Sequence, residues 1–257
     1  MQGEGATAPR VGVNVAGYFG STLGVGQSAR SMREALRAAG VPVAAVPLSA
    51  RGGEAVDIPF ALTRPEDAAF PVNLVCANAD GLDGARAQLG ERFFEGRRTV
   101  GVWWWEAGPF PERWARAFDL LDEVWVGSSH VASMLAPAAR IPVLALPMPV
   151  PPPAPADVER SRLGPSGEGF VFLYVFDYDS VFERKNPLAA VEAFARAFAD
   201  AGGARLVLKC LGADSHPAAH RRVLEAAGGH PGVEVVDRML TPTEMAALVE
   251  GSATSSS

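Results

Sequence analysis

Short apolar runs with the length of buried strands alternate with patterns typical of amphipathic helices along most of this chain. Such an alternation favours an α/β fold with mostly parallel sheets, because each helix returns the chain to the same end of its sheet. The predicted strands are 11–16, 43–48, 72–76, 100–105, 123–126, 142–146, 170–176, 205–211 and 233–236. The predicted helices are 27–39, one capped by Ser128 or Ser129 that runs through Leu135, 188–200, 218–227 and one from Thr243.

A proline-rich stretch divides this alternation into two parts. Six of the nine residues in 147–155 are proline, which excludes a helix or a central strand and predicts a stiff, extended linker. We therefore predict a first domain over 1–150, a linker over 151–168 and a second domain over 169–257. A doubly wound domain usually needs about 150 residues, so we expect the second domain to be incomplete.

Composition limits the classes of partner and compartment. The 257 residues are 48% hydrophobic and carry a formal net charge of −6, which argues against a broad nucleic-acid surface. The first ten residues show no apolar segment of a signal peptide, and no apolar run reaches the roughly 20 residues that span a bilayer. Cys76 and Cys210 lie within apolar strand runs, so we expect buried free thiols in a reducing cytoplasm.

The segment 177–187 places two cations between a predicted strand and a helix. Arg184 and Lys185 stand directly before Asn186, a good N-cap, and Pro187, a good first helical residue. Ligands of open α/β sheets bind at the carboxyl ends of the strands, and a helix N-terminus beside two cations suits a phosphate or diphosphate. The alternative is an ordinary solvated basic pair in a loop.

A glycine pattern begins the first helix. Gly24 and Gly26, followed by Ala29, match the G-x-G-x-x-A pattern of dinucleotide folds. However, Gly24 lies eight residues beyond the first predicted strand, and the second strand ends at Leu48 without an acidic residue for a ribose. A glycine loop that leans over a ligand therefore fits better than a nicotinamide site, and a flexible turn before the helix is the alternative.

Polar residues also follow several strands of the first half. They are Asn78 and Asp80, then Glu106, and then Ser128, Ser129 and His130. Carboxyl ends of parallel strands lie at one edge of a sheet, so these groups predict a cleft on the same edge as the glycine loop. Each of them taken alone is better explained as a helix cap or as support for neighbouring side chains than as a catalyst.

Two further features have simple structural interpretations. The run Trp103-Trp104-Trp105 with Phe110 fits a core strand that ends in a packed aromatic cluster, and peripheral contact with a membrane stays open. His216 and His220 have i,i+4 spacing but lack the partners of a metal motif, so we interpret them as a solvated helix start and predict no metal site.

Taken together, these residues resemble the GT4-type (group 1) glycosyltransferases, which have the two-domain GT-B fold. The resemblance covers nearly the whole chain, and Glu183-Arg184-Lys185-Asn186-Pro187 is its most specific element. The matching segments are 17–19, 23–30, 78–80, 104–106, 110–114 and 122–126 in the first domain, and 180–187, 206–209 and 243–245 in the second. The fold that it implies is α/β, a GT-B-like pair of Rossmann-like parallel-sheet domains with the second incomplete.

The resemblance implies a hexosyltransferase that works in the cleft between the two domains. It would move a hexose from a nucleotide-diphosphate sugar to a glycan or lipid-linked acceptor, with retention and without a metal or further cofactor. Arg184, Lys185 and Glu106 would be catalytic, and Gly24, Gly26 and Asn186 would join the basic pair around the donor. Asn78, Asp80 and Ser129 would contact the acceptor. The implied location is the cytoplasm, with contact at the inner membrane face left open.

One departure from the family pattern concerns the end of the chain. Family members carry a later Glu-x7-Glu segment that contacts the donor, and here the chain continues after Glu250 with Gly-Ser-Ala-Thr-Ser-Ser-Ser. We expect a truncated or frameshifted coding sequence. Two other functions therefore remain open: a non-catalytic binding or partner subunit that keeps the cleft, and an NAD(P)-binding oxidoreductase based on the glycine pattern.

Overall fold

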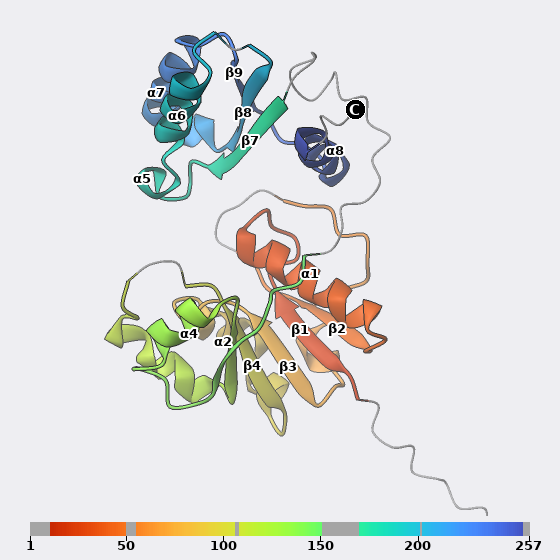
Figure 1. The fold of residues 1–257 in the computed structure, drawn as a ribbon. Coiled ribbons are helices and arrows are strands. Elements are labelled where there is room, and N and C mark those ends of the chain that lie inside the picture. Colours follow the sequence, from red (N-terminus) through yellow and green to blue (C-terminus); the bar gives the residue numbers. More distant parts are fainter. Residues whose placement is uncertain (1–10, 50–54, 106–107, 151–169, 201, 254–257) are drawn as a thin grey trace, which may run out of the picture. The chain divides into compact units, whose positions relative to one another are not determined.

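The computed structural model describes residues 11–49, 55–105, 108–150, 170–200 and 202–253. It divides into two compact units, Met1–Pro151 and Pro152–Ser257, and each unit has its own parallel sheet (Figure 1). The predicted linker over 151–168 lies outside the described residues, so the three predicted domain boundaries stay a prediction. The predicted α/β class with two parallel sheets is confirmed.

The first unit is built on a six-stranded sheet in which all neighbouring strands are parallel. Its order is β2-β1-β3-β4-β5-β6, with β1 Val13–Gly17, β2 Val43–Pro47, β3 Val72–Cys76, β4 Arg98–Trp103, β5 Glu123–Val126 and β6 Val143–Ala145. The chain leaves β1 for β2 on one side and later returns to its other side as β3. This reversal makes the carboxyl ends of β1 and β3 a topological switch point, the usual ligand position in such sheets.

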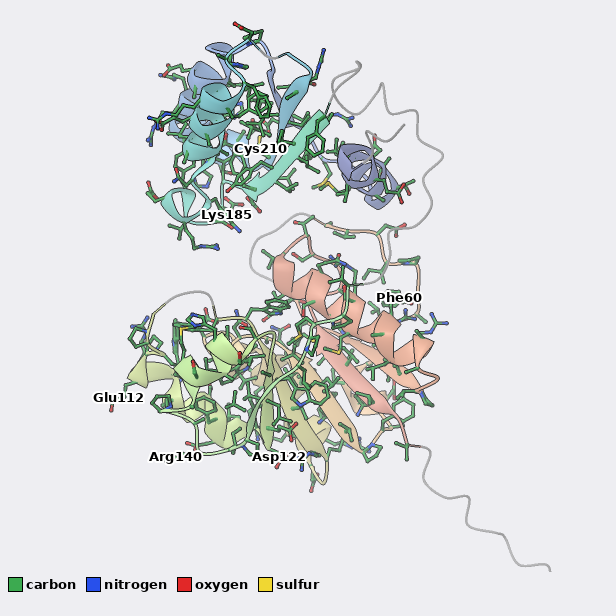
Figure 2. The ribbon with its side chains drawn as sticks, viewed as in Figure 1. Phe60, Glu112, Asp122, Arg140, Lys185 and Cys210 are labelled. Carbon is green, nitrogen blue, oxygen red and sulfur yellow. The ribbon has the colours of Figure 1, made fainter. Side chains whose placement is uncertain are left out.

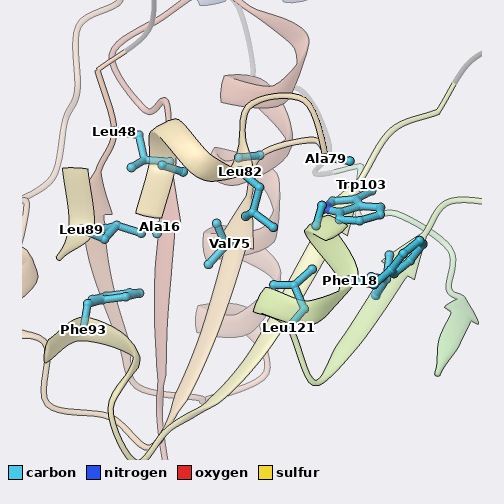
Figure 3. Packing of buried hydrophobic residues seen from close by; sticks show 14 of the residues in the cluster. Ala16, Leu48, Val75, Ala79, Leu82, Leu89, Phe93, Trp103, Phe118 and Leu121 are labelled. Carbon is cyan, nitrogen blue, oxygen red and sulfur yellow. The ribbon is translucent and has the colours of Figure 1, made fainter. Parts of the chain in front are cut away.

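Helices cover both faces of this sheet. They are α1 Gly24–Ala38, η1 Pro65–Asp67, α2 Leu82–Leu89, α3 Glu91–Phe94, η2 Glu112–Leu120 and α4 Ser129–Leu135. Helix α1 packs Ala29 and Met32 against Val15 and Leu74 on one face. On the opposite face, Leu82, Phe93 and Phe118 pack in one cluster with Val75 of β3 (Figure 3).

The second unit has a three-stranded parallel sheet in the order β7-β8-β9. Its elements are β7 Phe170–Asp177, α5 Phe182–Lys185, α6 Pro187–Ala197, β8 Ala204–Leu211, η4 Ala213–Ser215, α7 Pro217–Gly228, β9 Val233–Asp237 and α8 Pro242–Ala253. One face packs Phe176, Leu206 and Leu208 with residues of α6 and α7. The other face packs Val207 and Val236 with residues of α8.

Both cysteines are buried free thiols, as predicted. Burial raises the pKa of the Cys76 thiol to about 12 and that of Cys210 to about 11, so neither is a thiolate near neutral pH. No helix among the residues that the structure describes has the length and apolar character needed to cross a membrane.

A buried chain of polar side chains links three strands near their amino ends. Asn14 Nδ2 donates to Asn73 Oδ1 at 2.9 Å, and Asn73 Nδ2 donates in turn to Thr99 Oγ1 at 3.2 Å and to the Phe93 carbonyl oxygen at 3.0 Å. Both asparagines are fully buried. Because buried amides are costly unless bonded, this chain of bonds favours a single register of β1, β3 and β4.

We expect Asn73→Ala to lower the free energy of unfolding of the first unit by about 2–4 kcal/mol, because it leaves buried partners without their bonds. All five tryptophans lie in the first unit, so urea unfolding followed by tryptophan fluorescence reports this unit selectively. The control is Asp119→Ala at an exposed position of η2, for which we expect a change within about 0.5 kcal/mol. Equal stabilities of the two variants would contradict the structural role of Asn73.

Candidate functional site

The basic segment, residues 177–187, contains a short helix that the sequence pattern did not predict. Helix α5 ends at Lys185, and Asn186 follows in the left-handed conformation with φ 48° and ψ 54°. Asparagine tolerates this conformation better than most residues. The Asn186 Oδ1 accepts from the Ala189 N–H at 3.3 Å, and Pro187 is the first residue of α6. The predicted N-cap and first helical residue are therefore confirmed.

This sharp turn places the two cations directly before the N-terminus of α6. Arg184 is exposed and Lys185 is half-buried. Lys185 lies at the end of α5 (Figure 2). The hydroxyl of Tyr174 donates to the Lys185 carbonyl oxygen and fixes the backbone there. Within the described part of the chain, the Lys185 ammonium makes no ion pair, and the dipole of the 11-residue α6 adds positive potential at the same end. The end of α5 is thus locally suited to an anion, although the same segment also holds Asp177, Asp179 and Glu183 and the protein is acidic overall.

Tyr178 anchors the basic segment to the core of the second unit. Its side chain is 2% exposed, and its ring stacks on Phe182 of α5 with centroids 6.1 Å apart and planes 8° apart. Its hydroxyl oxygen lies 3.0 Å from Nδ1 of His220 on α7, within hydrogen-bonding distance. Burial raises the pKa of the hydroxyl, so it stays protonated. Through these contacts Tyr178 connects α5 to α7 and fixes the position of α5.

A second contact joins the basic segment to the loop after β8. His216 Nε2 donates to Asp179 Oδ1 at 2.9 Å. Gly212 has φ +81°, and a Cβ there would lie 3.2 Å from Asp177 Oδ1, so both the backbone conformation and the close packing favour glycine. The predicted helix start at His216 and His220 is confirmed, since His216 is the N-cap residue of α7. The sequence did not show that both histidines also contact this segment, His216 through Asp179 and His220 through Tyr178. In the ranges that the structure describes, no three His, Cys, Asp or Glu side chains gather to hold a metal ion.

In the first unit, the loop before α1 is tied to the helix by Arg30. The Arg30 guanidinium donates to the carbonyl oxygens of Phe19, at 2.6 Å, and Ser21, at 2.9 Å. Burial lowers the pKa of Arg30, but a guanidinium remains charged near neutral pH. The loop at the switch point is therefore held rigidly.

The two glycines of the predicted donor loop differ in their surroundings. A Cβ at Gly26 would lie 2.5 Å from the Tyr18 carbonyl oxygen and 2.8 Å from that of Ser21. A Cβ at Gly24 would meet nothing within 4 Å, and Gly24 is exposed at the first position of α1. Gly26 is thus required by packing within the loop itself, whereas Gly24 presents open backbone to solvent.

We expect Gly26→Ala to lower the free energy of unfolding by about 1–3 kcal/mol, because the new methyl group overlaps two backbone oxygens. Gly24→Ala should be neutral or stabilise the first unit by up to about 1 kcal/mol, because alanine is the better helix former. Urea unfolding followed by tryptophan fluorescence compares the two. A larger loss for Gly24→Ala than for Gly26→Ala would contradict this assignment.

Two of the polar residues that follow strands of the first unit interact with the end of a neighbouring strand. Asn78 Oδ1 accepts from the Trp104 backbone N–H at 2.7 Å. Asp80 is exposed near the Tyr18 hydroxyl, whose pKa is raised by burial and then by the charge of Asp80. The cap of α4 is Ser128, whose Oγ accepts from the Val131 N–H at 3.2 Å.

The structure says less about the two remaining predicted residues, Ser129 and Glu106. Ser129 is an exposed first residue of α4, and Glu106 lies outside the described residues. Tyr18, Ser28 and Trp104 also lie at this edge, and they were not predicted as site residues although they belong to the segments that carry the family resemblance. A polar or aromatic residue directly after a strand was the available signal for Tyr18 and Trp104, whereas Ser28 sits inside a helix and carried none.

The aromatic run after β4 separates into buried and exposed rings. Trp103 is 2% exposed and stacks on Phe110 with planes 9° apart. Trp105 packs edge-to-face on Phe110 and Trp114. The predicted packed aromatic cluster is therefore confirmed, and Trp104 stands apart from it with 40% exposure.

No family model and no curated protein matches this chain. Among solved structures, a UDP-forming α,α-trehalose-phosphate synthase from Burkholderia xenovorans matches with a TM-score of 0.56 and 13% identity, over 94% of this chain and 76% of that one. The Glycosylation Associate Protein (Gap123) complex from Streptococcus agalactiae matches with a TM-score of 0.40 and 9% identity, over 70% of this chain and 36% of that one. An S. aureus MnaA–UDP co-structure matches with a TM-score of 0.49 and 12% identity, over 94% and 72%.

At these identities the likeness concerns the fold alone. Of the three matches, only the synthase exceeds a TM-score of 0.5, and it extends over both sheets of this chain. The structural comparison therefore supports the two-unit α/β fold, and any activity has to be argued from the side chains.

Proposed function

We propose that this chain is a glycosyltransferase, or a portion of one, that uses a nucleotide-diphosphate sugar as its donor. The observation that carries the proposal is the placement of Arg184 and Lys185 before the N-terminus of α6, at the carboxyl end of β7. Asn186 fixes this placement by ending one helix and capping the next. The fold match to a synthase whose name states that it forms UDP supports a nucleoside diphosphate as the leaving group.

The chemistry explains why cations matter at this position. As the bond between the sugar C1 and the diphosphate oxygen breaks, the electron pair leaves with the diphosphate and its negative charge grows. Fixed cations stabilise this growing charge more than they stabilise the bound donor, so they lower the barrier as well as improve binding. Two such cations supply part of the positive charge that a divalent metal would otherwise supply. For this reason we propose that the reaction needs no metal.

In this proposal the acceptor binds at the carboxyl edge of the first sheet. Asn78, Asp80 and Ser129 would contact an acceptor hydroxyl, which passes its proton to the departing diphosphate as its oxygen attacks the sugar C1. Glu106 remains a proposed catalytic residue, and Gly24 offers the open backbone of the loop. Transfer of a hexose with retention to a glycan or lipid-linked acceptor, in the cytoplasm, is the specific form that we propose.

The geometry disfavours a dinucleotide-dependent oxidoreductase. In a dinucleotide site the second glycine lets the backbone approach a pyrophosphate. Here the corresponding space at Gly26 is taken by the carbonyl oxygens of Tyr18 and Ser21, which would repel an anion. In a dinucleotide site the glycine pattern follows the first strand directly. Here β1 ends at Gly17 and a loop lies between it and Gly24.

Isothermal titration of the 257-residue chain with UDP, GDP and NAD separates the classes of function. We expect at least one nucleoside diphosphate to bind and NAD not to bind. Binding of NAD without either nucleoside diphosphate would contradict the proposal. Where a nucleoside diphosphate binds, its release from UDP-glucose or GDP-mannose distinguishes an active enzyme from a non-catalytic binding subunit.

A further inference from the structure

Trp104 presents a fixed, exposed aromatic ring at the carboxyl edge of the first sheet. Its indole Nε1–H donates to Ser28 Oγ of α1 at 2.9 Å, and its backbone N–H donates to Asn78 Oδ1 at 2.7 Å. On another side of the ring, a Cβ at Gly127 after β5 would lie 3.7 Å from Trp104 Cζ3. One bond therefore orients the ring and another fixes its backbone, while Trp104 remains 40% exposed.

This restraint separates Trp104 from an ordinary exposed apolar side chain. Single exposed hydrophobic residues are normal and need no explanation. Here the one polar atom of the side chain is already bonded, and its partner Ser28 is itself only 8% exposed. What faces solvent is therefore the apolar surface of a ring whose orientation is set in advance, which reduces the entropy lost when a ligand stacks on it.

Polar residues and one carboxylate follow the strands on either side of Trp104. Trp104 follows β4, the neighbour of β3, and β3 leads directly to Asn78 and Asp80. Tyr18 follows β1 on the other side of β3, and Ser129 follows β5 on the other side of β4. A flat apolar surface thus shares one edge of the sheet with a carboxylate, a phenol and a hydroxyl.

From this arrangement we infer that Trp104 is a stacking platform for a pyranose ring of the acceptor. The two faces of a pyranose carry C–H groups that fit the electron-rich face of an indole. The hydroxyl groups around its rim need hydrogen-bond partners of the kind that Asp80, Tyr18 and Ser129 provide. This inference rests on the proposed function, because only a transferase has an acceptor. It adds that the acceptor is a carbohydrate.

A membrane surface is the other class of partner that an exposed tryptophan suggests, and the structure favours it less. Trp103 is buried and Trp105 packs within the aromatic cluster, so the run exposes one large ring and not three. The neighbouring charge is the carboxylate of Asp80, whereas contact with anionic lipids needs basic residues.

Saturation-transfer NMR on the 257-residue chain tests the platform with methyl glycosides of glucose, mannose, galactose and N-acetylglucosamine. We expect at least one glycoside to receive saturation on the C–H groups of one ring face. Trp104→Ala should weaken that binding about tenfold or more, whereas Trp104→Phe should retain most of it. Ser28→Ala keeps the ring but removes its tether, so it should weaken binding less than Trp104→Ala does.

The matched control is Leu144→Ala, at a similarly exposed apolar residue of β6, and it should leave glycoside binding unchanged. Absence of a signal from every glycoside, or equal binding by wild type and Trp104→Ala, would overturn the inference. Binding to phosphatidylglycerol vesicles that depends on Trp104, without any glycoside signal, would assign the ring to membrane contact and likewise overturn it. Nucleotide titration is a separate readout, so failure of the donor proposal is distinguishable from failure of the platform.

Discussion

Replacing Arg184 and Lys185 together by alanine is expected to reduce the affinity for UDP or GDP by roughly 10²–10⁴-fold. Each charge-assisted hydrogen bond to a phosphate contributes about 1.5–3 kcal/mol, and a factor of ten corresponds to about 1.4 kcal/mol. Lys185→Ala alone should therefore cost about 10–100-fold. Isothermal titration at two salt concentrations measures both the affinity and its dependence on ionic strength, which the double variant should largely lose.

The matched control for the basic pair is Arg196→Ala. Arg196 is an exposed arginine in the last turn of the same helix α6, where it pairs with Glu192 at 2.5 Å. The substitution Arg196→Ala removes one positive charge from the second unit and leaves the N-terminus of α6 unchanged. An equal loss of nucleotide affinity in Arg196→Ala and Lys185→Ala would mean that overall charge, and not the placed pair, binds the anion.

Replacing Tyr178 by alanine is expected to have the largest effect on stability. The change removes a buried ring that packs on Phe176, Phe182 and His220, and such losses cost about 3–5 kcal/mol. Since Tyr178 supports α5 from beneath, nucleotide affinity should fall as well, although Tyr178 does not itself belong to the proposed contact with the diphosphate. Hydrogen exchange followed by mass spectrometry measures the opening of the second unit directly.

Tyr178→Phe separates the ring from its hydroxyl. It keeps the aromatic packing and removes the hydroxyl, which contacts His220 Nδ1 and the Cys210 thiol, so the expected cost is about 1 kcal/mol. Nucleotide affinity should stay within a few fold of wild type. Tryptophan fluorescence provides an internal control, because the first unit holds all the tryptophans and should unfold unchanged in both variants. A Tyr178→Ala protein with wild-type exchange and affinity would remove Tyr178 from this supporting role.

Local signals in the sequence predicted much of the fold. The runs of β3 and β5 are apolar segments bounded by polar or turn residues, and their predicted limits coincide with the observed ones. Helix α2 was missed because Leu82, Ala85 and Leu89 form only a weak apolar stripe in a segment that includes Gly84. Short helices need little apolar periodicity when tertiary packing holds them, so pattern alone does not reveal them.

The candidate site shows the same division between local and distant information. The cap at Asn186 and Pro187 depends on neighbouring residues, and it was predicted correctly. The contact between Tyr178 and His220 joins residues 42 positions apart, and the tether of Trp104 to Ser28 joins residues 76 positions apart. Such pairs are brought together by strand order and helix packing, which no residue spacing in the sequence encodes.

Hydrogen exchange with and without UDP or GDP tests the central claim most directly, because it reports where the nucleotide acts on the chain. We predict slower exchange in the peptides that cover residues 178–190, where the basic pair meets the N-terminus of α6. Peptides from the amino ends of β1, β3 and β4 should not change. Protection confined to the glycine loop of the first unit, or no protection anywhere at saturating nucleotide, would contradict the proposed donor site.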